Sequence, residues 1–453
     1  MSPSERLVVI GGDAAGMSAA SQAQRTAGQA GRDIEIVALE RGPWTSYSAC
    51  GIPYWVSGAV QDRDDLIART PEQHRARGID VRLHTEAIGI DLDRRTVAVR
   101  DVAEATDGPV LEPVPFDQLV VATGAVPKRP SIPGIDATGV HGLQTLADGH
   151  QVIDWLTGQQ PERAVIVGAG YIGLEMAEAM VLRGAQVTVL DQAPEPMTTL
   201  DPDLGAEVRK ALEGLGIDVV TEVEVTEFES TEFESTDGTV SAVRTADGRY
   251  PADIVLLGLG VAPNTRIASE AGLPVGEFGG LRVDERMAVP GHPGIWAAGD
   301  CVEVHDRVSG EWAHIPLGTH ANRQGRVLGT NIAGGQATYP GMIRTAASKV
   351  CGLEIARTGL GESSAAEAGF DAFAVTTEST TTAGYYPGGE SITVKVIADR
   401  GTGRLIGAQI VGGQDSAKRI DTLALAVWQE ITVDELAMVD LSYAPPFSPT
   451  LDP

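Results

Sequence analysis

Short apolar runs alternate with a glycine-rich turn and a helical pattern at the start of the chain. Leu7–Ile10 is a continuous apolar run, which is typical of a buried parallel strand. A turn from Gly11 to Gly16 follows, then a helix of small residues from Met17 to about Ala27. The next apolar run, 34–39, ends at Glu40, 24 residues after Gly16. This order of strand, glycine turn, helix, strand and acid predicts a dinucleotide-binding unit.

The same pattern recurs after residue 160. Apolar residues 164–167 lead into Gly168-Ala169-Gly170-Tyr171-Ile172-Gly173, which is a complete G-x-G-x-x-G turn. A helical stretch then ends near Arg183, and a strand closes on Asp191, 18 residues after Gly173. Each such turn presents a helix N-terminus to one pyrophosphate, so the sequence predicts two bound dinucleotides.

Later runs indicate how these units are connected. Residues 119–122 lead into Thr123-Gly124, and residues 295–298 lead into Gly299-Asp300. We interpret both as returns of the chain to the first unit, which makes the second unit an insertion. The expected fold is α/β, with two Rossmann-like dinucleotide-binding domains and a C-terminal α+β domain. Expected bounds are 1–148 with 262–332 for the first dinucleotide-binding domain, 149–261 for the inserted one, and 333–453 for the C-terminal domain.

Composition narrows the function classes. A formal net charge of −28 argues against a nucleic-acid partner. Apolar runs are too short to cross a bilayer, and the chain enters its first strand without a signal-peptide pattern, so we expect no membrane and a cytoplasmic location. One local oddity is a tandem repeat of Thr-Glu-Phe-Glu-Ser at 226–230 and 231–235, expected in an exposed strand or hairpin.

Three cysteines are too few for a disulfide framework, and no Cys/His spacing suggests a metal. Cys50 differs from the others because Pro53 predicts a helix that begins just after it. A sulfur at a helix N-terminus is expected to have a lowered pKa and to be nucleophilic. Cys301, and Cys351 in an expected apolar helix, are interpreted as packing residues. The histidines at 74, 84 and 292 are expected at the surface.

Six segments carry a resemblance to a known family. They are Cys50-Gly51-Ile52-Pro53-Tyr54, Ala122-Thr123-Gly124, Gly299-Asp300, the stretch 318–326, Tyr385-Tyr386-Pro387-Gly388, and Tyr443-Ala444-Pro445-Pro446-Phe447-Ser448. On these segments the chain resembles the FAD-dependent pyridine nucleotide–disulfide oxidoreductases, and among them coenzyme A disulfide reductase. The resemblance covers essentially the whole chain.

The resemblance implies cofactor positions. FAD would be held by Gly11, Gly16, Glu40, Arg41, Thr123, Gly124 and Asp300. The nicotinamide cofactor would be held by Gly168, Gly170, Gly173 and Asp191, with Tyr171 as an aromatic gate over the flavin. Asp191 accepts hydrogen bonds from a ribose 2′-hydroxyl and repels a 2′-phosphate, which favours NADH over NADPH.

The resemblance also implies a substrate site and a homodimer. Cys50 matches the single redox cysteine, while Tyr443 and Tyr385 or Tyr386 match tyrosines that reach the active site from the partner subunit. Coenzyme A, a candidate bound thiol, would contact Gln22, Arg25, Ser46, Asn322 and Arg326. Three positions depart from the family pattern: Asp13 in the FAD turn, Ala49 in place of a frequent asparagine, and Phe447 in place of a second tyrosine.

No second cysteine lies four or five residues from Cys50, so its oxidised form is a mixed disulfide with a small thiol or a sulfenic acid. The expected reaction is reduction of coenzyme A disulfide, or a related small disulfide or persulfide, by NADH, with Tyr443 at the leaving sulfur. One alternative is an NADH oxidase or peroxidase that works through a sulfenic acid, although Ala14 replaces the histidine found in such relatives. The other is a flavoprotein that transfers electrons to a protein partner or senses NADH, against which Cys50 counts.

Overall fold

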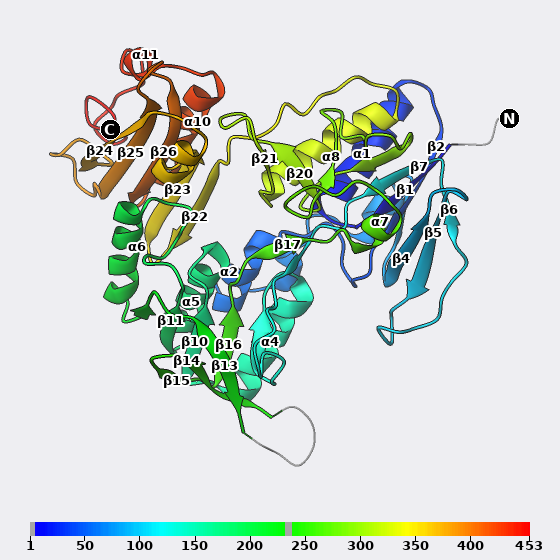
Figure 1. Ribbon diagram of the computed structural model, residues 1–453, viewed down its shortest axis with the longest axis horizontal. Coiled ribbons are helices and arrows are strands. Elements are labelled where there is room, and N and C mark those ends of the chain that lie inside the picture. Colours follow the sequence, from blue (N-terminus) through cyan, green and yellow to red (C-terminus); the bar gives the residue numbers. More distant parts are fainter. Residues whose placement is uncertain (1–4, 232–237) are drawn as a thin grey trace.

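The computed structural model describes residues 5–231 and 238–453 and shows three parts (Figure 1). The chain starts in the first part, passes through the second and returns to the first. It then ends in a separate C-terminal part, drawn in orange and red in Figure 1. Among the described residues, no helix has the length and apolar character needed to cross a membrane.

The first part is built on a parallel five-stranded sheet. Its strand order is β19 (Ile295–Ala297), β7 (Gln118–Val121), β1 (Glu5–Ile10), β2 (Ile34–Leu39) and β3 (Ile79–Arg82). Strand β19 comes from far along the chain, so the expected return to the first unit is confirmed. A small antiparallel sheet of β4 (Thr85–Asp91), β5 (Thr96–Asp101) and β6 (Val114–Pro115) is attached to it.

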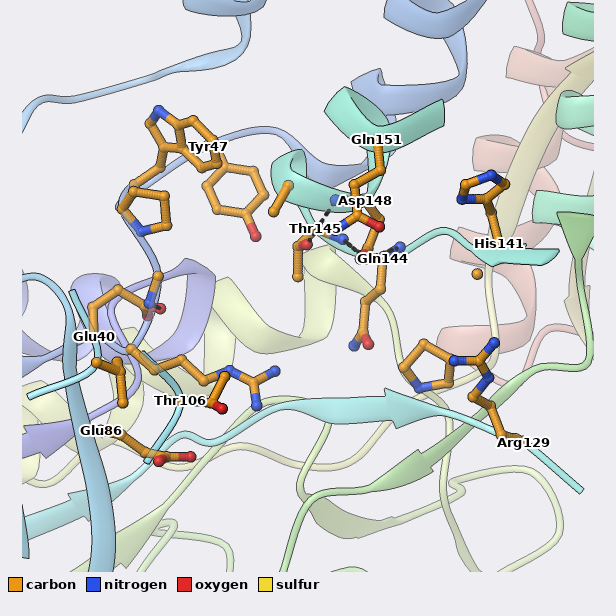
Figure 2. A pocket seen from close by; sticks show the side chains of 18 of the residues that line it. Glu40, Tyr47, Glu86, Thr106, Arg129, His141, Gln144, Thr145, Asp148 and Gln151 are labelled. Atoms are coloured by element: carbon orange, nitrogen blue, oxygen red, sulfur yellow. Dashed lines mark hydrogen bonds between the residues drawn. The ribbon is translucent and has the colours of Figure 1, made fainter. Parts of the chain in front are cut away.

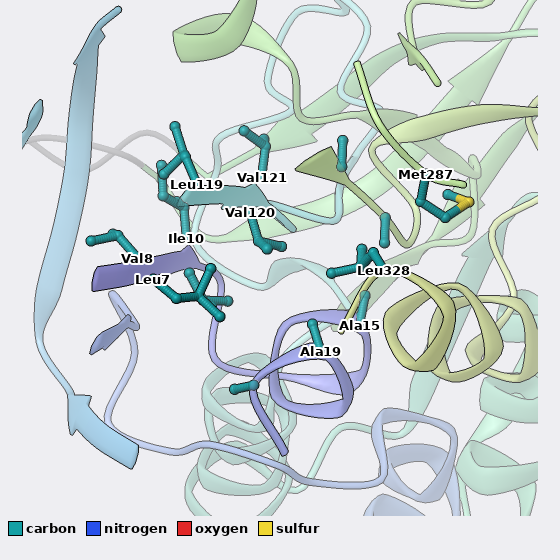
Figure 3. Close-up of a cluster of buried hydrophobic side chains, with 14 of the residues drawn as sticks. Leu7, Val8, Ile10, Ala15, Ala19, Leu119, Val120, Val121, Met287 and Leu328 are labelled. Carbon is teal, nitrogen blue, oxygen red and sulfur yellow. The ribbon is translucent and has the colours of Figure 1, made fainter. Parts of the chain in front are cut away.

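Two helices cross one face of this sheet in close contact. They are α1 (Ala14–Gln29) and α8 (Gly318–Ile332). A Cβ atom at Gly325 would lie 2.4 Å from the carbonyl oxygen of Ala15, so α8 approaches α1 at a distance that only glycine permits. Figure 3 shows Leu328 of α8 beside Ala15 and Ala19 of α1, with the apolar side chains of β1 and β7 above them. The core thus holds α1 and α8 together against one face of this sheet.

The second part repeats the architecture. Its parallel strands, in order, are β12 (Asp218–Val220), β11 (Gln186–Leu190), β10 (Arg163–Val167), β16 (Ile254–Leu257) and β9 (Val140–Gly142). Its helices are α4 (Leu146–Gln159), α5 (Tyr171–Leu182) and α6 (Pro202–Gly214). A smaller sheet contains β13 (Val225–Ser230), β14 (Val240–Thr245) and β15 (Arg249–Pro251). The two connections to the first part pair as β8 (Ala125–Pro127) and β17 (Val261–Pro263), which confirms the insertion.

The C-terminal part is an antiparallel sheet with helices, as expected. Its strands, in order, are β22 (Ala346–Val350), β23 (Leu353–Gly359), β26 (Leu405–Gly412), β25 (Ser391–Asp399) and β24 (Ala372–Thr380). Its helices are α9 (Glu362–Glu367), α10 (Ile420–Trp428) and α11 (Val433–Leu436). Lys395 of β25 is buried and bonds to Asp201 and Asp203 at the start of α6, which ties this sheet to the second part.

Three local expectations are corrected, and a fourth, on the tandem repeat, is only partly covered by the described residues. Helix α1 begins at Ala14, three residues earlier than expected. Cys351 lies in the turn between β22 and β23 at φ +57°, not in a helix. His74, in α3 (Pro71–Arg75), is fully buried, because it packs behind the segment that follows Glu40. The first copy of the tandem repeat overlaps β13, while residues 232–235 of the second copy lie outside the described residues.

Candidate active site

The first glycine turn has the close packing that a pyrophosphate cradle requires. Gly11 has φ +111°, and a Cβ atom there would lie 2.0 Å from the carbonyl oxygen of Ala122. A Cβ atom at Gly16 would lie 2.0 Å from the carbonyl oxygen of Gly11. The first turn of α1 therefore sits tight against the ends of β1 and β7, with its free backbone N–H groups at the edge of the sheet.

Asp13 stands where this turn usually has a glycine, and its side chain is compatible with a phosphate bound there. Its Oδ1 accepts a hydrogen bond from the backbone N–H of Tyr47 at 3.3 Å, so the carboxylate is used in local structure. Burial, with a smaller effect of the nearby Glu40 charge, raises the pKa of Asp13 to about 7. At neutral pH much of this side chain is therefore uncharged, which lessens its conflict with a phosphate.

Glu40 closes the turn from the end of β2. Its two oxygens accept backbone hydrogen bonds from Gly12 at 2.8 Å and Gly42 at 2.7 Å. Glu40 and Arg41 line a cavity of about 590 Å³ that extends to the start of α4. Figure 2 shows Glu40 on one side of this cavity and Gln144, Thr145 and Asp148 on the other. These features fit FAD: a cradle for the pyrophosphate, an acid for the ribose and adjoining space for the rest of the molecule.

Thr123, Gly124 and Asp300 follow the carboxyl ends of β7 and β19, which are neighbours in the sheet. Thr123 Oγ1 donates to the carbonyl oxygen of Asn264 at 2.5 Å, and Gly124 has φ +68°. Burial raises the pKa of Asp300, and the charge of His314 opposes that change. All three lie at the edge of the sheet where the first glycine turn lies.

The second glycine turn has the same construction. A Cβ atom at Gly173 would lie 1.9 Å from the carbonyl oxygen of Gly168, so α5 starts tightly against β10. Asp191, at the end of β11, accepts backbone hydrogen bonds from Ala169 at 2.5 Å and Ala193 at 2.7 Å. The carboxylate thus lies beside the glycine turn, where a ribose would follow a pyrophosphate.

Cys50 is an exposed residue in a short 3-10 turn, Ala49–Gly51, immediately before α2 (Ile52–Ser57). The helix after Cys50 is as expected, but the lowered pKa is not. Desolvation of the sulfur raises the pKa of Cys50, and the charge of Glu175 raises it further. Smaller contributions come from Asp300 and Asp13. Desolvation, with the added effect of these carboxylate charges, therefore raises the pKa of Cys50 even though the residue precedes a helix, which has only six residues.

Glu175 was not predicted as a site residue. It lies one turn into α5, and its Oε1 accepts a hydrogen bond from Ser348 Oγ at 2.8 Å. Burial raises the pKa of Glu175 to about 7, although the Ser348 hydrogen bond lowers it and the charge of Glu178 raises it. No sequence signal indicated this role, because α5 and α2 are brought together only by tertiary packing.

A second cavity, of about 540 Å³, brings together all five positions expected to contact coenzyme A. Gln22 and Arg25 come from α1, Ser46 from the segment after Glu40, and Asn322 and Arg326 from α8. The close approach of α1 and α8 explains why residues 300 positions apart share one wall. Arg69, which was not predicted, lines the same cavity. We call this cavity the arginine pocket.

The arginine pocket is cationic in an acidic protein. Arg25, Arg69 and Arg326 form no ion pair with a carboxylate in the part of the chain that the structure describes. Partial burial lowers the pKa of Arg69, and the charges of Arg77 and Arg25 add to this effect. Asp13 also lines the cavity, with its pKa raised to about 7 by burial, and three guanidinium groups without an ion-pair partner beside it suit an anionic ligand.

The predicted tyrosines lie on the C-terminal part. Tyr385 and Tyr443 are hydrogen-bonded to each other through their side chains, and this bond raises the pKa of Tyr385. Tyr385 is 77% exposed and the nearby Phe447 is 75% exposed. The exposure of large aromatic side chains such as Tyr385 and Phe447 is typical of an interface.

Tyr171 lies at the start of α5, in the second part, and accepts hydrogen bonds from Arg357 and Thr199, both at 3.3 Å.

Comparisons with known proteins agree with this architecture. Residues 5–325 match the pyridine nucleotide-disulphide oxidoreductase family, and residues 345–452 match the dimerisation domain of that family. The chain therefore belongs to the pyridine nucleotide-disulphide oxidoreductases, and the predicted fold class is confirmed. It is an oxidoreductase of a family that uses FAD and a pyridine nucleotide.

Individual relatives divide between sulfur and oxygen chemistry. A protein named NADH oxidase from Methanocaldococcus jannaschii is 38% identical over 99% of this chain and 96% of its own. A CoA-dependent NAD(P)H sulfur oxidoreductase from Pyrococcus abyssi is 34% identical over 99% of this chain and 96% of its own. The solved NAD-dependent persulfide reductase from A. fulgidus has a TM-score of 0.92 and 41% identity, over 99% of this chain and 81% of its own. These relatives are thus named for oxidation of NADH or for NAD(P)H-dependent reactions of sulfur compounds.

Proposed function

We propose that this protein uses NADH to reduce coenzyme A disulfide, or a related small disulfide or persulfide, through Cys50. The observation that carries the proposal is the arginine pocket. Its wall brings together, from separate elements, the five positions expected to contact coenzyme A, and it also includes Arg69, which was not expected. Its wall also includes Ser48, which lies two residues before Cys50. A nucleotide-bearing thiol would place its phosphates on the arginines and its sulfur toward Cys50.

The reaction follows from a single cysteine. The Cys50 thiolate attacks one sulfur of the disulfide, forms a mixed disulfide and expels the other half as a thiolate, which takes up a proton. FAD, when bound, relays two electrons from the nicotinamide to sulfur. Reduction of the mixed disulfide releases the second thiol and restores the thiolate. The sum is one NADH, one proton and one disulfide giving NAD⁺ and two thiols.

Several residues of the chain would assist this cycle. Asp191 would accept hydrogen bonds from the ribose hydroxyls of NADH and repel a 2′-phosphate, and the residues after it, Gln192 and Ala193, carry no positive charge. The Tyr385–Tyr443 pair would act on the leaving sulfur in a homodimer. The match to a dimerisation domain and the exposed aromatic side chains support that assembly.

The first test is anaerobic NADH oxidation by the FAD-loaded protein with coenzyme A disulfide. Rapid turnover is expected in the wild type and is expected to fall at least a thousandfold in Cys50→Ser. The matched control is Cys351→Ser, which removes a thiol that the mechanism does not use and should retain turnover. Equal turnover in wild type and Cys50→Ser would refute the proposed nucleophile.

A second candidate is reduction of oxygen or peroxide through a Cys50 sulfenic acid. The Methanocaldococcus jannaschii relative named NADH oxidase favours it. Against it, Ala14 stands at the first residue of α1, where the resembling oxidases and peroxidases have histidine. NADH consumption that starts only when oxygen or peroxide is admitted would move the assignment to this candidate.

A further inference from the structure

Ser46 is held in an unusual backbone conformation at the wall of the arginine pocket. Its φ is +52°, in the left-handed region that serine rarely occupies. The backbone is fixed on both sides, because Ser46 N–H donates to Gly12 at 3.1 Å and its carbonyl accepts from Ala68 at 2.8 Å. Such strain persists only where the surrounding structure imposes it, and it is concentrated at functional sites.

A buried histidine holds the Ser46 hydroxyl. His74 Nε2 lies 2.9 Å from Ser46 Oγ, and the His74 side chain is fully buried. Burial lowers the pKa of His74 to about 4, and the charges of Arg69 and Arg77 contribute. The ring is therefore neutral near pH 7 and carries one proton, on either Nδ1 or Nε2.

The partners of the ring decide which nitrogen carries that proton. His74 Nδ1 is buried and has no hydrogen-bond partner among the described residues. A buried N–H group without an acceptor is rarer in folded proteins than a buried acceptor without a donor. The proton therefore belongs on Nε2, and this nitrogen donates to Ser46 Oγ.

We propose that His74 is a positioning residue: by donating to Ser46 Oγ it directs the Ser46 hydroxyl proton to an anionic oxygen of the pocket's ligand. Among the described residues, the other hydroxyl within 3.5 Å of Ser46 Oγ is Thr45 Oγ1, which already donates to the carbonyl oxygen of Gly12. The pocket therefore presents a fixed hydroxyl donor beside three unpaired arginines. This donor pattern selects phosphate oxygens, and the inference deepens the proposed function, on which its choice of ligand rests.

The test separates the phosphate-bearing part of the ligand from the thiol arm. FAD-loaded variants are compared with coenzyme A disulfide, with the pantetheine disulfide that lacks the nucleotide, and by calorimetric titration of adenosine 3′,5′-bisphosphate. In His74→Phe we expect KM for coenzyme A disulfide and Kd for the bisphosphate to rise about 3- to 10-fold, because one hydrogen bond to a charged group loses its fixed geometry. We expect kcat, and all constants for the pantetheine disulfide, to change less than twofold.

Two further comparisons distinguish a positioning role of His74 from a role in packing alone: rescue by a conservative variant, and a double variant with Ser46. His74→Gln keeps an amide N–H at the position of Nε2 and should restore wild-type Kd, whereas His74→Asn is too short to reach Ser46 and should resemble His74→Phe. In a Ser46→Ala background, His74→Phe should add nothing further. FAD content and flavin reduction by NADH report folding, and if His74→Phe loses FAD, the comparison of Gln with Asn takes its place.

Three results would overturn the inference: an unchanged Kd in the Phe and Asn variants, an equal loss with the pantetheine disulfide, or full additivity with Ser46→Ala. No detectable bisphosphate binding by the wild type would also overturn it. Bisphosphate binding without turnover of coenzyme A disulfide would instead refute the proposed function alone, and the Kd comparison would still decide the role of His74.

Discussion

Replacing Glu175 by glutamine should change both the pH dependence of stability and the reactivity of Cys50. The pKa of Glu175 is raised from 4.5 to about 7, chiefly by burial. At about 1.4 kcal/mol for each tenfold change in proton affinity, ionised Glu175 costs the folded state about 3 kcal/mol. The pKa of Glu175 is higher in the folded state than in the unfolded state. The folded protein therefore keeps its full stability below pH 4.5 and loses about 3 kcal/mol of it as the pH rises through 7. Glu175→Gln keeps the shape and removes the charge.

Unfolding in urea at pH 5 and pH 8 measures the first effect. The wild type should lose up to about 3 kcal/mol of unfolding free energy more than Glu175→Gln between these two pH values. Ser348→Ala removes the hydrogen bond that lowers the pKa of Glu175, so it should extend the wild-type loss to higher pH. Equal pH dependence in wild type and Glu175→Gln would refute the assignment of a raised pKa.

Alkylation of reduced Cys50 by iodoacetamide measures the second effect. The Glu175 charge raises the pKa of Cys50, so Glu175→Gln should form the thiolate, and react, at lower pH. Glu178→Gln is the matched control, since Glu178 lies on the same helix and its charge is not among those that raise the pKa of Cys50. An unchanged alkylation profile in Glu175→Gln, or one as strongly shifted in Glu178→Gln, would contradict this reasoning.

Three further predictions concern the cofactors and the junction between the parts. Gly16→Ala, whose Cβ would lie 2.0 Å from a carbonyl oxygen, should lower the FAD content of the purified protein at least tenfold, whereas Gly28→Ala on the same helix meets nothing within 4 Å and should keep it. Asp191→Ala should raise the NADPH-to-NADH ratio of kcat/KM at least tenfold, and an unchanged ratio would remove its role in cofactor choice. Lys395→Met leaves Asp201 buried without its cation and should cost about 3–5 kcal/mol in urea unfolding. Asp203→Asn, at a half-exposed carboxylate, should cost about 1 kcal/mol or less.

The two dinucleotide-binding units could be predicted from the sequence because their chemistry is local. A glycine turn between an apolar strand and a helix, with an acid after the next strand, is one continuous segment in which steric limits dictate residue type. Gly11, Gly16 and Glu40 therefore lie together as expected. The insertion of one unit in the other also followed from the order of apolar runs.

Only the tertiary structure determines which charged and polar residues from distant parts of the sequence come into contact. The expectation of a lowered pKa at Cys50 was wrong, because packing desolvates the sulfur and brings the charge of Glu175 to it from 125 residues away. His74 was expected at the surface, but the segment that carries Ser46 packs over it. The arginine pocket combines α1, α8 and Arg69, and no sequence pattern specifies that combination. Sequence periodicity determines which face of an element is buried, while the charges that face one another across a site depend on how whole elements pack.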